Sequence, residues 1–340
     1  MAGRRMKLAA GAALGVVGTG LASGRYLVHR DRRRPDPESR EDFFGLTGVP
    51  VVAESFDGTK LHAEVMGSGP EIVLAHGLSV SLASWYYQRR DLRDAFRVVA
   101  WDHRGHGHSG PAGSGGLSME SLARDCRAVL DQTGVRRCVL VGHSMGGTMA
   151  VKFAEMFPEE IGGRVAGLAL IDTGCVSLEM LPAGRDPATD WLRGLVASAP
   201  KRYARQIAWL LARSRREGSD LSYFLSRYFA FGVNALPSHV RFLEAIAQPA
   251  SAETITGLLP DLLDCDLSHV LARINIPTLV ITGGMDRLTP PAAARRMAEG
   301  IRDSRLVVLE KAGHMALMEQ PQVVTAHLRA FCSEVLQGGG

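Results

Sequence analysis

The segment CVLVGHSMGG at residues 138–147 constrains the possible folds of this chain more than any other feature. An apolar run leads directly into Ser144, which lies between Gly142 and Gly146. Glycines at these positions relieve steric crowding at a sharp corner, where the residue between them is expected to adopt a strained backbone conformation. A G-x-S-x-G pattern between a strand and a helix is typical of a nucleophile elbow. We therefore expect the Ser144 hydroxyl to project from the end of a sheet.

The rest of the chain alternates short apolar runs with longer helical patterns, which is typical of an α/β fold with a mostly parallel, twisted sheet flanked by helices. Asp57-Gly58-Thr59 predicts a hairpin that opens the sheet in antiparallel fashion. The predicted strands are 49–55, 60–66, 71–77, 97–102, 138–144, 165–174, 276–284 and 305–314. The predicted helices between them are 119–133, 145–157, 291–300 and 321–336.

A long insertion separates the sixth predicted strand from the seventh, whereas a crossover needs only about a dozen residues. We interpret residues 176–272 as a helical cap, between core parts at 49–175 and 273–337. Its aromatic residues have helix-like spacing and should mostly form the core of the cap, with a few facing a pocket: Trp191, Tyr203, Trp209, Tyr223, Phe224, Tyr228, Phe229 and Phe231. Ligands of open α/β sheets bind outside the carboxyl ends of the strands, so the cap would cover that site.

Positive charge is concentrated at the start of the chain. Residues 1–40 contain nine Lys or Arg against three Asp or Glu, a surplus of six, while the whole chain carries +4. The other 300 residues therefore carry −2, which argues against nucleic-acid binding by the body.

Residues 8–24 are uncharged but too few to span a bilayer unless Tyr26-Leu27-Val28 joins them. We interpret residues 1–40 first as a weak membrane anchor, second as an uncleaved export signal and third as a cleaved signal. The protein is thus expected to be membrane-associated or exported, with its orientation open. Residues 41–48 predict an exposed linker, and neither segment is expected to complete the core. Five widely spaced cysteines, at 126, 138, 175, 265 and 332, indicate small core residues without an obligatory disulfide.

A serine hydroxyl needs a base within hydrogen-bond reach, and the base needs a group to orient it. Asp286 follows the seventh predicted strand and His314 follows the eighth, which gives the chain order serine, acid, histidine. Asp172, at the end of the sixth strand, is the alternative acid. The N–H groups of Leu78 and Met145 are candidate donors to a tetrahedral oxyanion.

These motifs together resemble the α/β-hydrolase fold superfamily, in its cap-bearing branch of esterases, lipases and haloperoxidase-like enzymes. The resemblance runs from HGLS at 76–79 through DHRGHGHS at 102–109, GHSMGG and GGMDRLTP to AGHMALMEQP at 312–321. It implies a catalytic triad of Ser144, His314 and Asp286 and an oxyanion hole at Leu78 and Met145. It also implies that the 102–109 segment is a structural turn.

Other residues of these motifs have less direct interpretations. His103, His106 and His108 could suggest a metal site, but their glycine-rich context favours a tight turn, and we predict no metal. His76 is expected to support the oxyanion loop. Trp85 has core and pocket-wall interpretations of equal weight. His143 is not expected to be the base and is a candidate pocket residue.

The serine at the elbow predicts a hydrolase that cleaves small carboxylic esters through an acyl-enzyme, without a cofactor. The large apolar cap favours a hydrophobic acyl or alcohol group. One alternative is a cofactor-free haloperoxidase or perhydrolase that uses the same triad. The other is a non-catalytic binding module on the same fold, since a fold does not fix a function.

Overall fold

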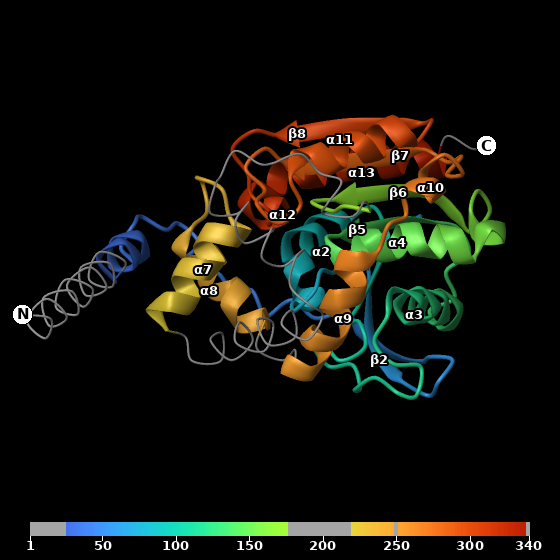
Figure 1. Cartoon of the computed structure of the whole chain (residues 1–340), viewed down its shortest axis with the longest axis horizontal. Coiled ribbons are helices and arrows are strands. Elements are labelled where there is room, and N and C mark those ends of the chain that lie inside the picture. Colours follow the sequence, from blue (N-terminus) through green and yellow to red (C-terminus); the bar gives the residue numbers. More distant parts are fainter. Residues whose placement is uncertain (1–24, 176–218, 248–250, 338–340) are drawn as a thin grey trace, which may run out of the picture.

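The computed structural model describes residues 25–175, 219–247 and 251–337. Its centre is a sheet flanked by helices (Figure 1). The strand order of this sheet is β1-β2-β4-β3-β5-β6-β7-β8. The strands are β1 Val49–Glu54, β2 Lys60–Met66, β3 Glu71–Ala75, β4 Arg97–Trp101, β5 Cys138–His143, β6 Val165–Ile171, β7 Thr278–Gly283 and β8 Ser304–Leu309. The β1–β2 and β2–β4 pairs are antiparallel and the other pairs are parallel. The predicted sheet is confirmed, including its antiparallel opening hairpin.

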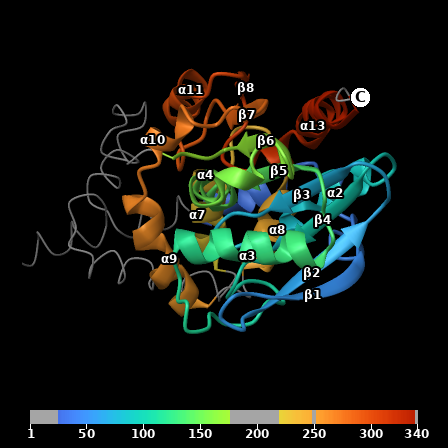
Figure 2. The same ribbon diagram turned by 90° about the vertical axis from the view of Figure 1, so that its right-hand side faces the viewer.

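Helices cover both faces of this sheet, as Figure 2 shows. The helices of one face are α3 Met119–Gln132, α4 Met145–Met156, α10 Ser268–Leu271 and α11 Pro291–Gly300. Those of the other are α2 Tyr86–Leu92, α12 Ala316–Glu319 and α13 Pro321–Gln337. Successive residues of β3 and β5 alternate between the two hydrophobic clusters, because side chains of a strand point to opposite faces. The central strands are therefore apolar at almost every position.

Among the described residues, the cap helices α7 Asp220–Ala230, α8 Pro237–Ala247 and α9 Ala252–Asp264 lie between β6 and β7 in the chain. The predicted helical insertion at this point of the sequence is confirmed. Trp191, Tyr203 and Trp209 of the predicted aromatic series lie outside the described residues. Of its other members, Tyr223 and Phe231 are buried, whereas Phe224 is exposed.

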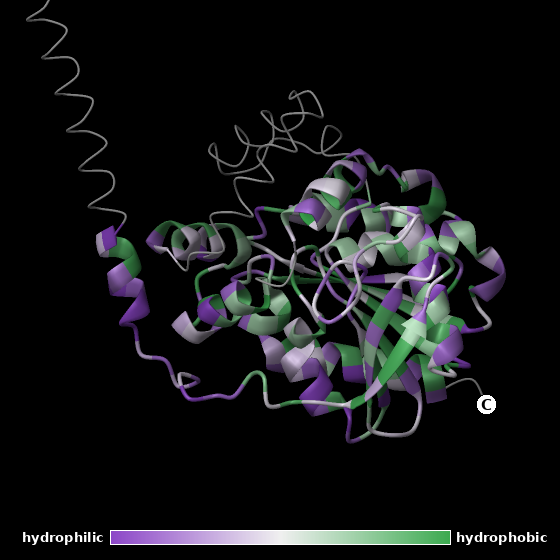
Figure 3. Cartoon of the chain, turned by 90° about the horizontal axis from the view of Figure 1, so that it is seen from below, coloured by the Kyte–Doolittle hydropathy of each residue, from purple (hydrophilic) through white to green (hydrophobic). Residues whose placement is uncertain are grey.

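Residues 25–46, here called the strap, precede β1 and run along the body as a largely hydrophilic ribbon (Figure 3). Residues 25–32 are helical. Val28 and Phe43 are nevertheless buried in the same cluster as α2 and α13, and the Phe43 ring stacks on Phe242 of α8 with centroids 4.6 Å apart. The prediction that these segments add nothing to the core is wrong, because Phe43 packs between Tyr86 of α2 and Phe242 of the cap, and Val28 is buried in the same cluster.

Polar groups of the strap bind the starts of two cap helices. Arg32 donates to Asp220 in the first turn of α7, with Nη1 and Oδ1 2.8 Å apart. Asp36 accepts hydrogen bonds from the N–H and the hydroxyl of Ser238 at 2.7 and 2.9 Å. It therefore satisfies a main-chain donor at the beginning of α8 that the helix itself leaves unpaired. No helix within the described ranges is both long and apolar enough to cross a bilayer, and residues 8–24 lie outside those ranges.

Candidate active site

Ser144 occupies the sharp turn between β5 and α4. Its backbone has φ 51° and ψ −120°, a conformation that residues other than glycine rarely adopt. The Ser144 N–H donates to Ile171 O of the neighbouring strand at 3.0 Å, which holds the turn against the sheet. A Cβ at Gly146 would lie 2.3 Å from Ala75 O, so only glycine lets α4 pack this closely on β3. The elbow has the strained geometry that its glycines predict.

His314 bridges Ser144 and Asp286. Its Nε2 lies 2.9 Å from the Ser144 hydroxyl oxygen, and its Nδ1 lies 2.9 Å from Asp286 Oδ2. His314 and Asp286 are almost fully buried, while Ser144 is partly accessible. The three residues thus form the hydrogen-bonded chain in which a base contacts a nucleophile and an acid orients the base.

Thr289 is a functional neighbour that the sequence reasoning missed. Its hydroxyl donates to Asp286 Oδ2 at 2.7 Å, while the N–H groups of Leu288 and Thr289 donate to Asp286 Oδ1 at 2.8 and 2.9 Å. Three donors on one carboxylate fix its orientation. The spacing Asp-x-x-Thr is a signal for such a local turn.

Asp172, the alternative acid, does not contact His314. It is fully buried, and its two oxygens accept the N–H groups of Gly283 at 2.7 Å and Ala316 at 3.0 Å. Burial, reinforced by the nearby charge of Asp286, raises the pKa of Asp172 well above its ordinary value. Asp172 therefore links the end of β7 to the segment that follows His314, and the geometry favours Asp286 as the orienting acid.

The N–H groups of Leu78 and Met145 have no recorded hydrogen-bond acceptor within the described residues. Met145 is the first residue of α4, where the helix leaves its own N–H groups unpaired. Leu78 belongs to the loop after β3, beside the elbow. Both predicted donors are therefore available to an oxyanion.

A cluster of buried histidines holds the loop that carries Leu78. His106 Nε2 accepts the Ser79 N–H at 3.1 Å, and His76 Nε2 accepts the His103 N–H at 2.9 Å. His76 also bonds to Gly77 O through Nδ1 at 2.7 Å. A ring nitrogen that accepts an N–H must be unprotonated, so His76 and His106 are neutral here. Burial lowers the pKa of His106 to about 4 and that of His103 to about 3.

The two candidate pocket residues lie in the packed interior instead. His143 is buried and bonds through Nε2 to His314 O at 2.9 Å, so it supports the backbone of the histidine loop. Trp85 has no exposed surface and belongs to the main hydrophobic cluster, and its ring lies nearly perpendicular to that of His143, with centroids 6.3 Å apart. The core interpretation of Trp85 is therefore favoured over the pocket-wall one, and the pocket interpretation of His143 is corrected, because both side chains are buried.

The suggested trio of His103, His106 and His108 does not gather around one point. The first two are buried and bonded to backbone, while the side chain of His108 is 83% exposed. His62, Asp102 and His108 do offer ligand atoms within 4.8 Å of one another among the described residues. The Asp102 carboxylate is already occupied by the N–H groups of Leu82 and His108, both at 2.8 Å. These two hydrogen bonds favour a structural role for the Asp102 carboxylate in the 102–109 turn over a role as a metal ligand.

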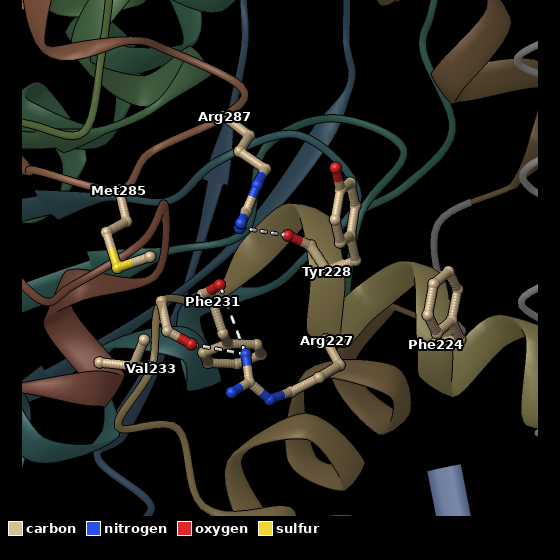
Figure 4. Close-up of a pocket in the computed structure, with 8 residues that line it drawn as sticks. Phe224, Arg227, Tyr228, Phe231, Val233, Met285 and Arg287 are labelled. Carbon is tan, nitrogen blue, oxygen red and sulfur yellow. Dashed lines mark hydrogen bonds between the residues drawn. The ribbon is translucent and has the colours of Figure 1, made fainter. Parts of the chain in front are cut away.

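A cavity of about 220 Å³ lies between α7 and the loop that carries Asp286 (Figure 4). Two guanidinium groups border it among apolar and aromatic side chains. Arg287 donates to Tyr228 O at 2.9 Å, and Arg227 donates to Gly232 O at 2.6 Å, as the dashed lines show. The cavity is lined by Phe224, Arg227, Tyr228, Phe231, Gly232, Val233, Met285 and Arg287. It adjoins the acid of the triad and does not include Ser144.

Residues 70–321 match the family model described as the alpha/beta hydrolase fold. This match covers most of the chain and every residue of the Ser144 site. The chain belongs to the α/β-hydrolase fold family. Its sheet order, its elbow and the order of its three polar residues along the chain are thus features of a hydrolase.

Relatives of this hydrolase differ in what their names say of their substrates. A protein of Azorhizobium caulinodans, provisionally named the carbamate hydrolase RutD, is 27% identical over 82% of this chain and 96% of its own length. A thermophilic esterase from Thermogutta terrifontis is 28% identical, with a TM-score of 0.68 over 84% of this chain and 99% of its own. A bacterial membrane phospholipase A is 27% identical, with a TM-score of 0.67 over 97% of this chain and 96% of its own. The match with the phospholipase therefore extends over almost the whole chain.

Proposed function

We propose that this hydrolase cleaves carboxylic esters with Ser144 as the nucleophile, and that its substrates are acyl esters of membrane lipids. The observation that carries the reaction type is the chain of hydrogen bonds from Ser144 through His314 to Asp286. The two available N–H groups at Leu78 and Met145 support it, because acyl transfer passes through an oxyanion.

The reaction has two halves. Ser144 Oγ attacks the ester carbonyl carbon as its proton passes to His314 Nε2, while the carbonyl oxygen accepts the N–H groups of Leu78 and Met145. The carbon–oxygen bond to the alcohol then breaks, and His314 gives its proton to the departing alcohol oxygen. Water, deprotonated by His314, attacks the acyl-enzyme in the same geometry and releases the acid. Asp286 keeps the proton on Nδ1 and stabilises the imidazolium in both halves.

The choice of lipid esters has two supports. The phospholipase named above is similar over nearly the full length, whereas the esterase is similar over a smaller share of the chain. The uncharged residues 8–24 are flanked by arginine and lysine, a composition that suits attachment to an anionic bilayer. We propose that this segment attaches the enzyme to the membrane that holds its substrate.

The test uses the full-length protein with esters of short, medium and long acyl chains and with phospholipid vesicles. We expect Ser144-dependent fatty-acid release and labelling of Ser144 by a fluorophosphonate, with the Ser144→Ala variant as the control. Carbamates and added hydrogen peroxide are run in parallel. Faster turnover of a carbamate, or peracid formation ahead of hydrolysis, would reassign the reaction. An unlabelled Ser144 would favour the binding-module alternative.

A further inference from the structure

Glu319 is a buried carboxylate at the end of α12 that the proposed reaction does not use. It accepts three main-chain N–H groups. Oε2 lies 2.8 Å from Gly232 N and 3.1 Å from Gly313 N, and Oε1 lies 2.9 Å from Asn234 N. Gly313 directly precedes His314, whereas Gly232 and Asn234 lie in the loop between cap helices α7 and α8. One side chain thus joins the histidine loop to the cap.

The same two segments also meet through their backbones. The Met315 N–H donates to Ala230 O at 2.8 Å, and the Val233 N–H donates to Lys311 O at 3.2 Å. A Cβ at Gly232 would lie 2.2 Å from Lys311 O, so the two chains approach each other too closely for a side chain there. Residues 230–234 and 311–315 consequently form one packed unit.

The histidine loop has a main-chain bond at every residue from 313 to 316. Each bond goes to a different residue: Gly313 N–H to Glu319, His314 C=O to His143, Met315 N–H to Ala230 and Ala316 N–H to Asp172. His143 is the last residue of β5 and Asp172 directly follows β6, so their two bonds connect the loop to the sheet. The Ala230 bond comes from the cap, and Glu319 couples its own bond to the cap. Half of the support of this loop therefore depends on where α7 and α8 lie.

We propose that Glu319 is a positioning residue, which sets the backbone of His314 by holding it against the 230–234 segment of the cap. This inference rests on the proposed function of His314 as the base. An ionised carboxylate is the side chain that accepts all three N–H groups. In the Glu319→Gln variant the shape is kept, but an NH2 group faces a main-chain donor in place of an acceptor. The imidazole is then held less firmly at its 2.9 Å distance from Ser144.

The test compares Glu319→Gln with Glu71→Gln. Glu71 also accepts main-chain N–H groups, from Arg136 and Arg137, but it lies at the opposite end of β3 from the site. We expect Glu319→Gln to lower kcat on a short ester by about 10–100-fold with little change in KM, because a small misplacement of a catalytic group has that cost. We expect Glu71→Gln to keep its kcat at a similar loss of stability.

Two further measurements test the inference independently of the kinetics of Glu319→Gln. Gly232→Ala breaks the same contact from the cap side and should lower kcat in the same way, even if Glu319→Gln does not fold. Amide hydrogen exchange at residues 313–316 should quicken in Glu319→Gln and not in Glu71→Gln, and this readout needs no substrate. Unchanged exchange and unchanged kcat in the folded variants would overturn the inference. A wild-type protein that turns over no ester would instead overturn the proposed function.

Discussion

The elbow region and the strap are held in place by opposite kinds of interaction. Around Ser144 the supporting groups are buried and mostly neutral, and they include histidines that accept N–H groups. The strap relies largely on acidic and basic side chains that bind the cap helices, such as the partly exposed Arg32 and the largely buried Asp36. The difference indicates that the Ser144 region depends on a dry, rigid frame, whereas in the placement of the cap the strap adds salt-sensitive polar contacts to the apolar packing of Phe43.

The largest expected effect comes from removing one atom at the elbow. Ser144→Ala should abolish ester turnover, since loss of the nucleophile costs about 10⁶ in comparable triads. Stability should change little, because the hydroxyl contributes nothing to the strained turn. Steady-state assays and thermal unfolding check both statements. Residual activity above a few per cent in a clean preparation would remove Ser144 from the reaction.

The two buried aspartates should respond differently to the same substitution. Asp286→Asn should lower turnover by about 10⁴, because an amide at the orienting position stabilises the wrong tautomer of His314. Asp172→Asn should mainly lower the free energy of unfolding, by about 1–3 kcal/mol, because its amide would face a main-chain N–H. Steady-state kinetics and denaturant titrations on both variants measure the two predicted losses. The reverse ranking of activities would transfer the acid role to Asp172.

Acid should act on the elbow region more than on the strap. Burial lowers the pKa values of His76, His103, His106 and His143, so the unfolded chain binds more protons below the ordinary value of 6.5. The stabilisation from these neutral histidines is therefore fully present above about pH 6.5. It falls as the pH drops toward the lowered pKa values, by about 2 kcal/mol per histidine at about pH 5. Denaturant unfolding across this pH range measures how steeply the free energy of unfolding falls. A flat profile between neutral and mildly acidic pH would contradict the neutral histidine cluster.

Neighbouring phenylalanines of the strap provide a matched pair. Phe43 is 8% exposed and stacks on Phe242, whereas Phe44 is 58% exposed. Phe43→Ala should lower the free energy of unfolding by about 3–5 kcal/mol, the usual range for a buried phenylalanine. Phe44→Ala should cost much less. Equal, small effects in both variants would show that the strap does not anchor the cap.

Deleting residues 1–24 should leave kinetics on a short ester unchanged, whereas deleting residues 1–46 should not.

The smallest effect is expected at the surface pair between the strap and α7. Asp220→Asn removes the partner that Arg32 shares with Arg25 and His29, and solvent-accessible pairs contribute about 0.2–1 kcal/mol. The difference from wild type should shrink further in high salt. Unfolding measured at low and high ionic strength tests this. A large, salt-independent loss would place Asp220 among the buried supports of the cap.

Local patterns predicted the elbow, the eight strands and the loops of Asp286 and His314, because each depends on residues that are close together in the sequence. The burial of His143 could not be predicted this way, and the sequence left the core and pocket interpretations of Trp85 open, since the burial of both depends on tertiary packing. Glu319 and the strap were missed for the same reason. Glu319 bonds to residues more than eighty positions away, and Asp36 to a residue about two hundred positions away. Nothing local marks such partners.

The position of Met145 at the start of α4 has an electrostatic consequence. The peptide dipoles of a helix add up to about half a positive charge at its N-terminus. In α4 that end lies beside Ser144, and the helix is buried along almost its whole length. Mobile ions have little access along such a helix, so its field is weakly screened at the place where the proposed reaction develops negative charge on a carbonyl oxygen. The helix that follows the turn between Gly142 and Gly146 thus also supplies a fixed positive potential for the proposed reaction.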